Sequence, residues 1–353
     1  MRLLCRSFSS DTSRIDFRYR QRESVLAEAE PNIEPDQELR YMVRDYHVRR
    51  HLGSGAGARV YLGQHKNCLR QKVALKVVDK KLPSAASCPT NSGTHKAACV
   101  DPCCQERALR MARREIAVLK ELPPHKNIIK LIDTVENQKR LCIVLEYADG
   151  GDLFEYVCRN GRLQEWEAWT IFRQIIEAIG HMHKHGFIHR DIKPENILLT
   201  MDRRVLLCDF GLGARWSSLS PTNAICGSFH YAAPEVLTAE YYVGPEVDLW
   251  SCGAVLYMML MGRVPFAAPT SAESLNNILC GALDLGFHVS LEAADLLRRL
   301  LQPNSLHRAT LLDVWSHPWF NRAPHRERSA SAPWLKTYPA LSFHNDPLQC
   351  NYA

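Results

Sequence analysis

Four polar side chains with a distinctive spacing stand near the middle of the chain. Asp191 is followed by Lys193 and Asn196, and eighteen residues after Asp191 comes Asp209, the first residue of an Asp-Phe-Gly sequence. Transfer of a phosphoryl group needs a carboxylate that receives the proton of a hydroxyl, oxygen ligands for magnesium, and a cation near the phosphates. These four residues supply that set of groups. The sequence therefore predicts phosphoryl transfer.

The segment around Asp191 carries further fixed positions. It reads His189-Arg-Asp-Ile-Lys-Pro-Glu-Asn196, and this run combined with the later Asp-Phe-Gly has too many constraints for an easy chance match. The chain resembles a eukaryotic-type protein kinase. Residues 226–235 and 242–252 most resemble the calcium/calmodulin-dependent group, and within it the AMP-activated/SNF1-related branch.

The resemblance implies a role for each of these polar residues. Asp191 would accept the proton of the substrate hydroxyl or orient that hydroxyl. Asn196 and Asp209 would coordinate Mg²⁺, a hard cation that prefers oxygen ligands and that Mn²⁺ could replace. Lys193 would steady the γ-phosphate of ATP and marks a Ser/Thr enzyme. Taken singly, each carboxylate could instead be a helix cap or part of a salt bridge.

A lysine and a glutamate earlier in the chain complete the expected catalytic set. Lys76 resembles the strand lysine that contacts the α- and β-phosphates in this family, and Glu115 is the expected partner that holds it through an ion pair. The alternative for Glu115 is an exposed helix charge that pairs with Lys120 or Arg114. That alternative suits Glu121 better.

A glycine-rich segment at residues 53–58 is the expected phosphate cover. A glycine-rich hairpin alone is more often only a turn, but the lysine strand and the catalytic segment that follow favour the nucleotide interpretation. The family's third glycine is Ala58 here. By resemblance, the adenine ring would contact apolar side chains and the backbone that connects the lobes. The residues predicted to bind the nucleotide are Leu52, Gly53, Ser54, Gly55, Ala56, Gly57, Ala58, Arg59, Val60, Ala74, Lys76, Leu145, Glu146, Ala148, Asp152, Leu198 and Asp209.

The elements that must position these residues indicate an α+β fold. Residues 48–64 alternate around the glycines and residues 72–78 are rich in β-branched side chains, which predicts three strands of a small antiparallel sheet. Apolar residues recur at helical spacing over residues 163–185, and helical patterns continue to residue 320. A β-rich half followed by a helical half matches the bilobal protein-kinase plan. In that plan Glu235 pairs with Arg308, and Asp248 supports the catalytic segment.

Composition and periodicity predict the domain boundaries. Residues 1–45 are charged and lack sustained periodicity, so we expect a disordered arm. Residues 46–320 would form the catalytic domain and residues 321–353 a C-terminal tail. Within the domain, residues 46–148 would be the N-lobe, with an insert over residues 82–105, and residues 149–320 the C-lobe.

Charge and hydropathy limit the kinds of partner. The 44 Lys and Arg against 38 Asp and Glu give a net charge of +6, which we interpret as solvated surface and not as a nucleic-acid site. The longest apolar run, residues 252–261, is far shorter than the roughly 20 residues that cross a bilayer. Thirteen scattered cysteines without a signal peptide favour reduced thiols. The basic, Ser-rich start resembles a transit peptide, but the acids that follow favour a cytoplasmic or nuclear location.

The segment between Asp209 and Glu235 departs from the family pattern. Relatives carry a phosphorylatable Thr two residues before a Cys-Gly pair, where this chain has Ala224. Arg190 would normally bind that phosphate and order the segment. We therefore expect an enzyme that is either intrinsically active or switched by another hydroxyl, for which the alternatives are Ser217, Ser218, Ser220 and Thr222.

The insert over residues 82–105 offers a second possible metal site. Its Cys and His side chains could bind zinc, but their spacing fits none of the paired-cysteine zinc motifs, so a disordered loop with reduced thiols is favoured. The residues concerned are Cys88, His95, Cys99, Cys103 and Cys104.

Two features bear on protein partners. Asp152, Glu155 and Glu195 lie near the expected peptide groove and would favour a substrate with Arg three residues before the target hydroxyl, although they could equally be solvated charges. In the tail, Arg328-Ser-Ala-Ser-Ala-Pro333 resembles a 14-3-3 docking motif once Ser331 is phosphorylated. Most such matches in tails are accidental.

Three functional interpretations remain open. The first is an active ATP-dependent Ser/Thr protein kinase that acts on protein substrates, favoured because Lys76, Asp191 and Asp209 are all present. The second is a scaffold in which the fold only presents a surface. The third is a small-molecule phosphotransferase, which Lys193 and the Ala-Ala-Pro-Glu run ending at Glu235 disfavour. The sequence does not indicate an oligomeric state.

Overall fold

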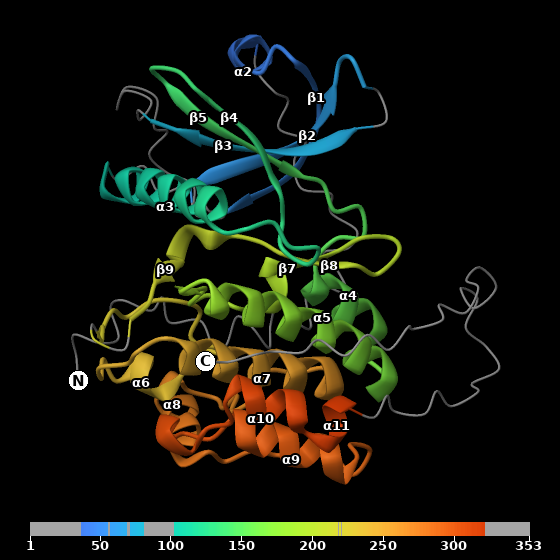
Figure 1. Cartoon of the computed structure of the whole chain (residues 1–353), viewed down its shortest axis with the longest axis vertical. Coiled ribbons are helices and arrows are strands. Elements are labelled where there is room, and N and C mark those ends of the chain that lie inside the picture. Colours follow the sequence, from blue (N-terminus) through green and yellow to red (C-terminus); the bar gives the residue numbers. More distant parts are fainter. Residues whose placement is uncertain are drawn as a thin grey trace, which may run out of the picture.

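The computed structural model describes residues 37–55, 57–68, 71–80, 102–217, 219 and 221–321, with residues 102–104 described by their backbone. A β-sheet with one long helix lies at one end of the molecule, and a larger group of helices lies at the other (Figure 1). The expected α+β plan with two lobes is thus confirmed.

The smaller lobe is built on five antiparallel strands. They are β1 (Tyr46–Gly55), β2 (Ala58–His65), β3 (Lys72–Asp79), β4 (Leu131–Glu136) and β5 (Arg140–Glu146), in the spatial order β1-β2-β3-β5-β4. The first three are the strands that alternation predicted. Helix α3 (Pro102–Glu121) packs against β3, β4 and β5.

The strand register gives the two faces of this sheet different partners. Val60 lies opposite Lys76, and Ala74 lies opposite Leu145, so these side chains share the face that carries Lys76. The other face carries Tyr61, Val73, Leu75, Val77, Cys142 and Val144, all buried in a separate apolar cluster.

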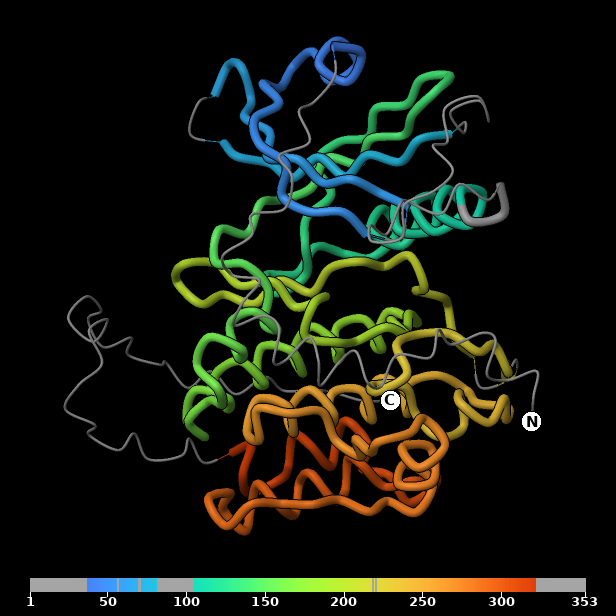
Figure 2. The backbone as a smooth tube through the Cα atoms, turned by 180° about the vertical axis from the view of Figure 1, so that it is seen from behind, coloured from blue at the N-terminus to red at the C-terminus, as the bar shows by residue number. Residues whose placement is uncertain are grey.

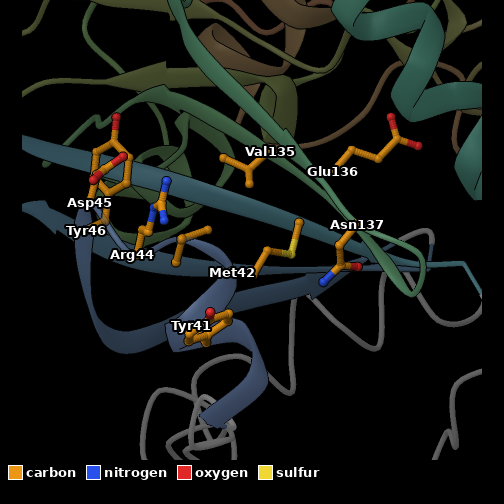
Figure 3. Close-up of a pocket in the computed structure, with 9 residues that line it drawn as sticks. Tyr41, Met42, Arg44, Asp45, Tyr46, Val135, Glu136 and Asn137 are labelled. Atoms are coloured by element: carbon orange, nitrogen blue, oxygen red, sulfur yellow. The ribbon is translucent and has the colours of Figure 1, made fainter.

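Helix α2 (Gln37–Met42) covers that second face, in a part of the chain for which a disordered arm was predicted. Leu39 and Val43 are buried against the sheet, and Lys139 pairs with Glu38 at 3.1 Å. The N-terminal Tyr41 to Tyr46 stretch and the β4–β5 turn line a hollow of about 360 Å³ (Figure 3). The prediction of a disordered arm over residues 1–45 is therefore wrong for residues 37–45, and residues 1–36 lie outside the described part.

The predicted insert is also shorter at its C-terminal end than expected. Helix α3 begins at Pro102, so residues 102–105 belong to its first turn. The remaining insert residues, including the side chains of the five Cys and His residues considered for zinc, lie outside the described part.

The larger lobe is organised around two buried helices. Helix α5 (Glu165–Lys184) is the predicted helix, and its apolar face is buried. Helix α7 (Pro245–Met261) is buried from Val247 to Leu260, which explains the apolar run in the sequence as a core helix. Around them lie α4 (Leu153–Asn160), α6 (Pro234–Leu237), α8 (Ser271–Cys280), α9 (Leu291–Leu300), α10 (Leu311–Ser316) and α11 (Pro318–Asn321).

One further prediction about this lobe is borne out by the described residues. Arg308 forms two hydrogen bonds to Glu235, at 2.6 and 2.8 Å, and both side chains are buried. Every cysteine with a described side chain is a free thiol. Within the same residues, no helix combines the length and the hydropathy that crossing a bilayer requires.

Two short two-stranded sheets hold the segment that carries Asp191 and Asp209. Strand β6 (Phe187–Ile188) pairs with β9 (Ala214–Arg215), and β7 (Ile197–Leu199) pairs with β8 (Val205–Leu207). The 3₁₀ turn Pro194–Asn196 lies between β6 and β7, and the 3₁₀ turn Phe210–Leu212 lies between β8 and β9. Seen from behind, this yellow-green stretch crosses the middle of the molecule between the sheet and the helices (Figure 2).

Candidate active site

The ammonium group of Lys76 joins three elements from two lobes. Its Nζ atom lies 2.6 Å from Glu115 Oε2 on α3 and 3.1 Å from Asp209 Oδ1, at the start of the Asp-Phe-Gly turn. The expected ion pair between Lys76 and Glu115 is therefore present. Glu121, the exposed alternative on the same helix, pairs instead with Arg215.

Burial and charge act in opposite directions on this group of side chains. Burial lowers the pKa of Lys76, but the Glu115 and Asp209 carboxylates outweigh it and raise that pKa above its ordinary value. Burial likewise raises the pKa of Asp209, and the Lys76 ammonium overcomes this and lowers it. Lys76 and Asp209 therefore both stay ionised at neutral pH.

The carboxylate of Asp248 holds the backbone of the catalytic segment in place. Its Oδ2 atom accepts from His189 N at 2.9 Å and from the His183 ring at 2.8 Å, and its Oδ1 atom accepts from Arg190 N at 2.9 Å. Burial raises the pKa of Asp248, but these hydrogen bonds and the nearby imidazoles lower it below its ordinary value. The expected supporting role of Asp248 is confirmed.

Two residues of the site have left-handed backbone conformations, which are unfavourable for residues other than glycine. Arg190 has φ 65° and Asp209 has φ 63°, both in the left-handed region. Each such residue costs of order 1–3 kcal/mol, and it persists only where the surroundings determine the conformation. For Arg190 the Asp248 carboxylate supplies that constraint directly.

Three donors surround the carboxylate of Asp191. Ser228 Oγ donates to its Oδ1 atom at 2.9 Å, while Lys193 Nζ and Asn196 Nδ2 donate to its Oδ2 atom at 2.8 and 3.1 Å. Lys193 also donates to Ser228 Oγ at 3.0 Å. Burial lowers the pKa of Lys193, and the adjacent Asp191 outweighs this and raises it. The site thus holds a fixed carboxylate beside a permanent cation.

Asn196 and Asp209 each keep an oxygen atom that can coordinate a magnesium ion. The Nδ2 atom of Asn196 donates to Asp191, which leaves the Oδ1 oxygen of Asn196 as a metal ligand. Asp209 uses Oδ1 for Lys76, and among the described residues its Oδ2 atom has no partner. Mg²⁺ commonly takes one or two protein oxygens and fills its other positions with water and phosphate oxygens. The described residues contain no cluster of three or more His, Cys, Asp and Glu side chains arranged for a metal, and Mg²⁺ bound in this way requires none.

The predicted adenine-contacting residues line the junction between the lobes. Val60, Ala74 and Leu145 lie on the face of the sheet that carries Lys76, and Leu198 on β7 faces them from the larger lobe, paired to Asp152 by a β-bridge. A Cβ atom added at Gly53 or Gly55 would meet no atom within 4 Å. These glycines therefore leave open space beside the β1–β2 turn, where a ligand backbone or phosphate can approach.

The remaining predicted positions vary in how their side chains are used. The Arg59 side chain pairs with Asp79 at 2.5 Å, so only the backbone of Arg59 is available to a nucleotide. Ala56 lies outside the described residues. Asp152 caps α4 by accepting from Glu155 N at 2.7 Å. Glu146 pairs with Arg204 of the larger lobe at 2.5 Å, so its side chain links the lobes while its backbone stays in the connector. Leu52 and Ser54 lie in β1, Gly57 in the β1–β2 turn, Ala58 at the start of β2, and Ala148 in the connector between the lobes.

Two residues of the site were missed from the sequence. Ser228 lies in the 226–235 segment that carries the family resemblance, but no role was predicted for it. It hydrogen-bonds to both Asp191 and Lys193. His189 is buried, packs against Phe210, and accepts from Asp191 N at 3.3 Å. The proximity of His189 to Asp191 in sequence could have signalled its role, whereas the contact of Ser228 spans 37 residues and had no local signal.

Comparison with known proteins extends these observations to most of the chain. Residues 46–320 match the family described as protein kinase domain. The chain is 39% identical over 276 residues to the sucrose non-fermenting protein kinase 1 of Fusarium virguliforme, covering 78% of this chain and 36% of that protein. It is 37% identical over 278 residues to the carbon catabolite-derepressing protein kinase of Candida glabrata, covering 79% and 42%. The chain thus spans about two fifths, or less, of the length of these curated relatives.

The buried Asp248 carboxylate gives a prediction about stability. Replacing it by Asn puts an amide donor against groups that already donate, so we expect Asp248→Asn to lower the free energy of unfolding by about 3 kcal/mol. Urea unfolding measures this. Asp284→Asn is the control, because the Asp284 side chain is 79% exposed and, among the described residues, pairs only with Arg263, and we expect a change of roughly 0.5 kcal/mol or less. Equal urea midpoints for Asp248→Asn and the wild type would contradict the role of Asp248.

Proposed function

The chain belongs to the protein kinase family, and on this premise we propose that it transfers the γ-phosphate of Mg-ATP to Ser or Thr hydroxyls of protein substrates. The observation that carries this proposal is the convergence of Lys76, Asp191 and Asp209 from distant parts of the sequence. A scaffold that only presents a surface has no need of three intact polar residues in one cleft.

Each described side chain has a defined task in this reaction. The Lys76 ammonium, held by Glu115, is placed to bind phosphate oxygens of the nucleotide. The Asp191 carboxylate, fixed by Ser228 and Lys193, is placed to accept a hydrogen bond from the substrate hydroxyl and then its proton. Mg²⁺ held by Asn196 and Asp209 would neutralise charge on the phosphates, and Mn²⁺ is proposed as a substitute with the same oxygen ligands.

The acceptor is proposed to be Ser or Thr in a basic sequence context. Lys193 reaches both Asp191 and Ser228, an arrangement that resembles Ser/Thr kinases. The 3₁₀ turn that carries Glu195 packs against α4, which carries Glu155, so the two acids lie on adjacent elements. Glu195 is exposed, and Glu155 pairs weakly with Arg159 on its own helix. These carboxylates support a preference for Arg before the target hydroxyl. The two relatives reported above support the placement near the SNF1-related branch.

Further partners and the location of the chain remain proposals from the sequence. A phosphorylated Ser331 is proposed to bind 14-3-3 proteins. The test is a binding assay between a 14-3-3 protein and a phosphorylated peptide of residues 325–337, and a peptide that does not bind would refute the proposal. Ser331 lies outside the described residues. A cytoplasmic or nuclear location is proposed on the same footing.

The role of Asp191 gives the first prediction about activity. We expect Asp191→Asn to reduce the rate of phosphate transfer to a Ser peptide by about 10²–10⁴-fold, because the amide cannot accept the hydroxyl proton. ATP binding, measured by calorimetry, should remain, since Asp191 does not contact Lys76. Asp284→Asn serves again as the exposed control and should retain the wild-type rate. Full activity of Asp191→Asn would exclude the proposed mechanism.

The exposed carboxylate of Glu195 gives a prediction about specificity. With a pair of peptides that carry Arg or Ala three residues before Ser, we expect Glu195→Gln to lower the ratio of their kcat/KM values about fivefold, as for an exposed charge pair worth roughly 1 kcal/mol. Glu292→Gln, an exposed acid on α9, should leave the ratio unchanged. A wild-type enzyme that does not distinguish the two peptides would refute the basic preference.

A further inference from the structure

Residues 221–230, in the segment that follows the Asp-Phe-Gly turn, have a defined conformation although Ala224 offers no hydroxyl for phosphorylation. Arg190, which by resemblance would bind a phosphate in this segment, forms no ion pair with any residue that the structure describes. Its Nε atom donates to Leu212 O at 2.8 Å, which ties it to the Asp-Phe-Gly turn. Some other group must therefore connect Arg190 with the segment around Ala224.

Tyr242, just before α7, makes that connection. Its backbone forms a two-hydrogen-bond bridge with Thr222, at 2.9 and 2.8 Å. Its hydroxyl donates to Ala224 O at 2.9 Å and lies 3.8 Å from Cys226 Sγ. The Arg190 guanidinium is near enough to lower the pKa of this hydroxyl. The side chain is buried, with 5% of its surface exposed. Tyr242 thus holds the segment around Ala224 beside Arg190.

The chemistry of the hydroxyl suits both contacts at once. Burial raises the pKa of Tyr242 to about 12, and Arg190 opposes this only in part. The group therefore keeps its proton at neutral pH, so it donates to the Ala224 carbonyl and keeps oxygen lone pairs on the side of the nearby Arg190 cation. A phosphate oxygen would satisfy Arg190 in the same way but would bring negative charge to the segment.

Close packing on both sides of Tyr242 supports a fixed position for this segment. Gly227 has φ 89°, and a Cβ atom there would lie 2.6 Å from Arg190 O, so the segment backbone touches the catalytic segment. Gly244 has φ 149°, and a Cβ atom there would lie 2.9 Å from Trp216 Cβ. Gly227 is thus packed against the catalytic segment, and Trp216 against the chain that carries Tyr242.

We propose that Tyr242 is a positioning residue that holds residues 222–227 against Arg190 in place of a phosphate, so that activity requires no phosphorylation of this segment. This proposal rests on the proposed kinase function. Residues 222–227 are connected to the predicted catalytic carboxylate through one residue, because Ser228 follows Gly227 in the chain and donates to Asp191. Loss of the Tyr242 contacts would loosen Ser228 and with it the orientation of the Asp191 carboxylate.

The test compares phosphatase-treated wild type with two matched Tyr→Phe variants of the full chain. Tyr242→Phe keeps the ring and removes only the hydroxyl, and Tyr241→Phe does the same at the adjacent, 73% exposed position. We expect wild type and Tyr241→Phe to transfer phosphate equally. We expect Tyr242→Phe to lose about tenfold in kcat, the size of one lost buried hydrogen bond, with its KM for ATP unchanged within about twofold.

A rescue variant separates positioning from simple packing. Ala224→Glu places a carboxylate near Arg190, so Tyr242→Phe combined with Ala224→Glu should recover at least half of the lost activity. Failure of this rescue, or full activity of Tyr242→Phe alone, would overturn the proposal. Wild type that loses its activity on phosphatase treatment would overturn it as well, because the segment would then need phosphate.

Amide hydrogen exchange over residues 221–230 gives a readout that does not depend on catalysis. We expect faster exchange there in Tyr242→Phe than in Tyr241→Phe, with unchanged exchange in α7 as evidence of an intact fold. Equal exchange in the two variants would overturn the proposal even if the protein transferred no phosphate. A wild type without activity but with the expected exchange difference would count against the kinase function alone.

Discussion

The structure depends most on one largely buried cation, the ammonium of Lys76 with 19% of its side chain exposed, which is shared by two carboxylates from different elements. Glu115 reaches it from α3 and Asp209 from the start of the Asp-Phe-Gly turn, 133 residues further along the chain. An ion buried to this degree persists only when it is paired, so the sheet, the helix and the turn must come together for any of the three to be stable there. The Gly211 backbone approaches Met111 of α3 closely, which brings the turn and the helix into direct contact.

The Asp248 carboxylate holds the larger lobe's catalytic segment in place, as the Lys76 ammonium joins elements of the two lobes. It accepts the backbone amides of His189 and Arg190 and so fixes the segment that carries Asp191. The segment after the Asp-Phe-Gly turn completes the arrangement through Ser228, which donates to Asp191. The charged side chains of the site are thus held in place by two buried carboxylates: Glu115 pairs with Lys76, and Asp248 accepts backbone amides of the catalytic segment.

The sequence was sufficient wherever function constrains residue type and spacing together. The Lys76–Glu115 pair and the supporting role of Asp248 followed from the resemblance to protein kinases, whereas the strands and the long helix followed from sustained periodicity. Helix α2 could not be predicted, because two apolar residues four apart, Leu39 and Val43, are too few to show a period. Contacts such as Ser228 to Asp191 depend on how distant segments are brought together, which no local pattern records.

The central claim is that the buried pair at Lys76 prepares the cleft for phosphoryl transfer. The most direct measurement is the single-turnover rate of γ-phosphate transfer from Mg-ATP by Glu115→Gln, compared with Glu121→Gln on the same helix. Glu115 is 1% exposed and bonded to Lys76, whereas Glu121 is half exposed and bonded to Arg215. The account predicts a rate at least about tenfold lower for Glu115→Gln, because a buried ion pair is broken, and a wild-type rate for Glu121→Gln. Equal rates in the two variants would contradict it.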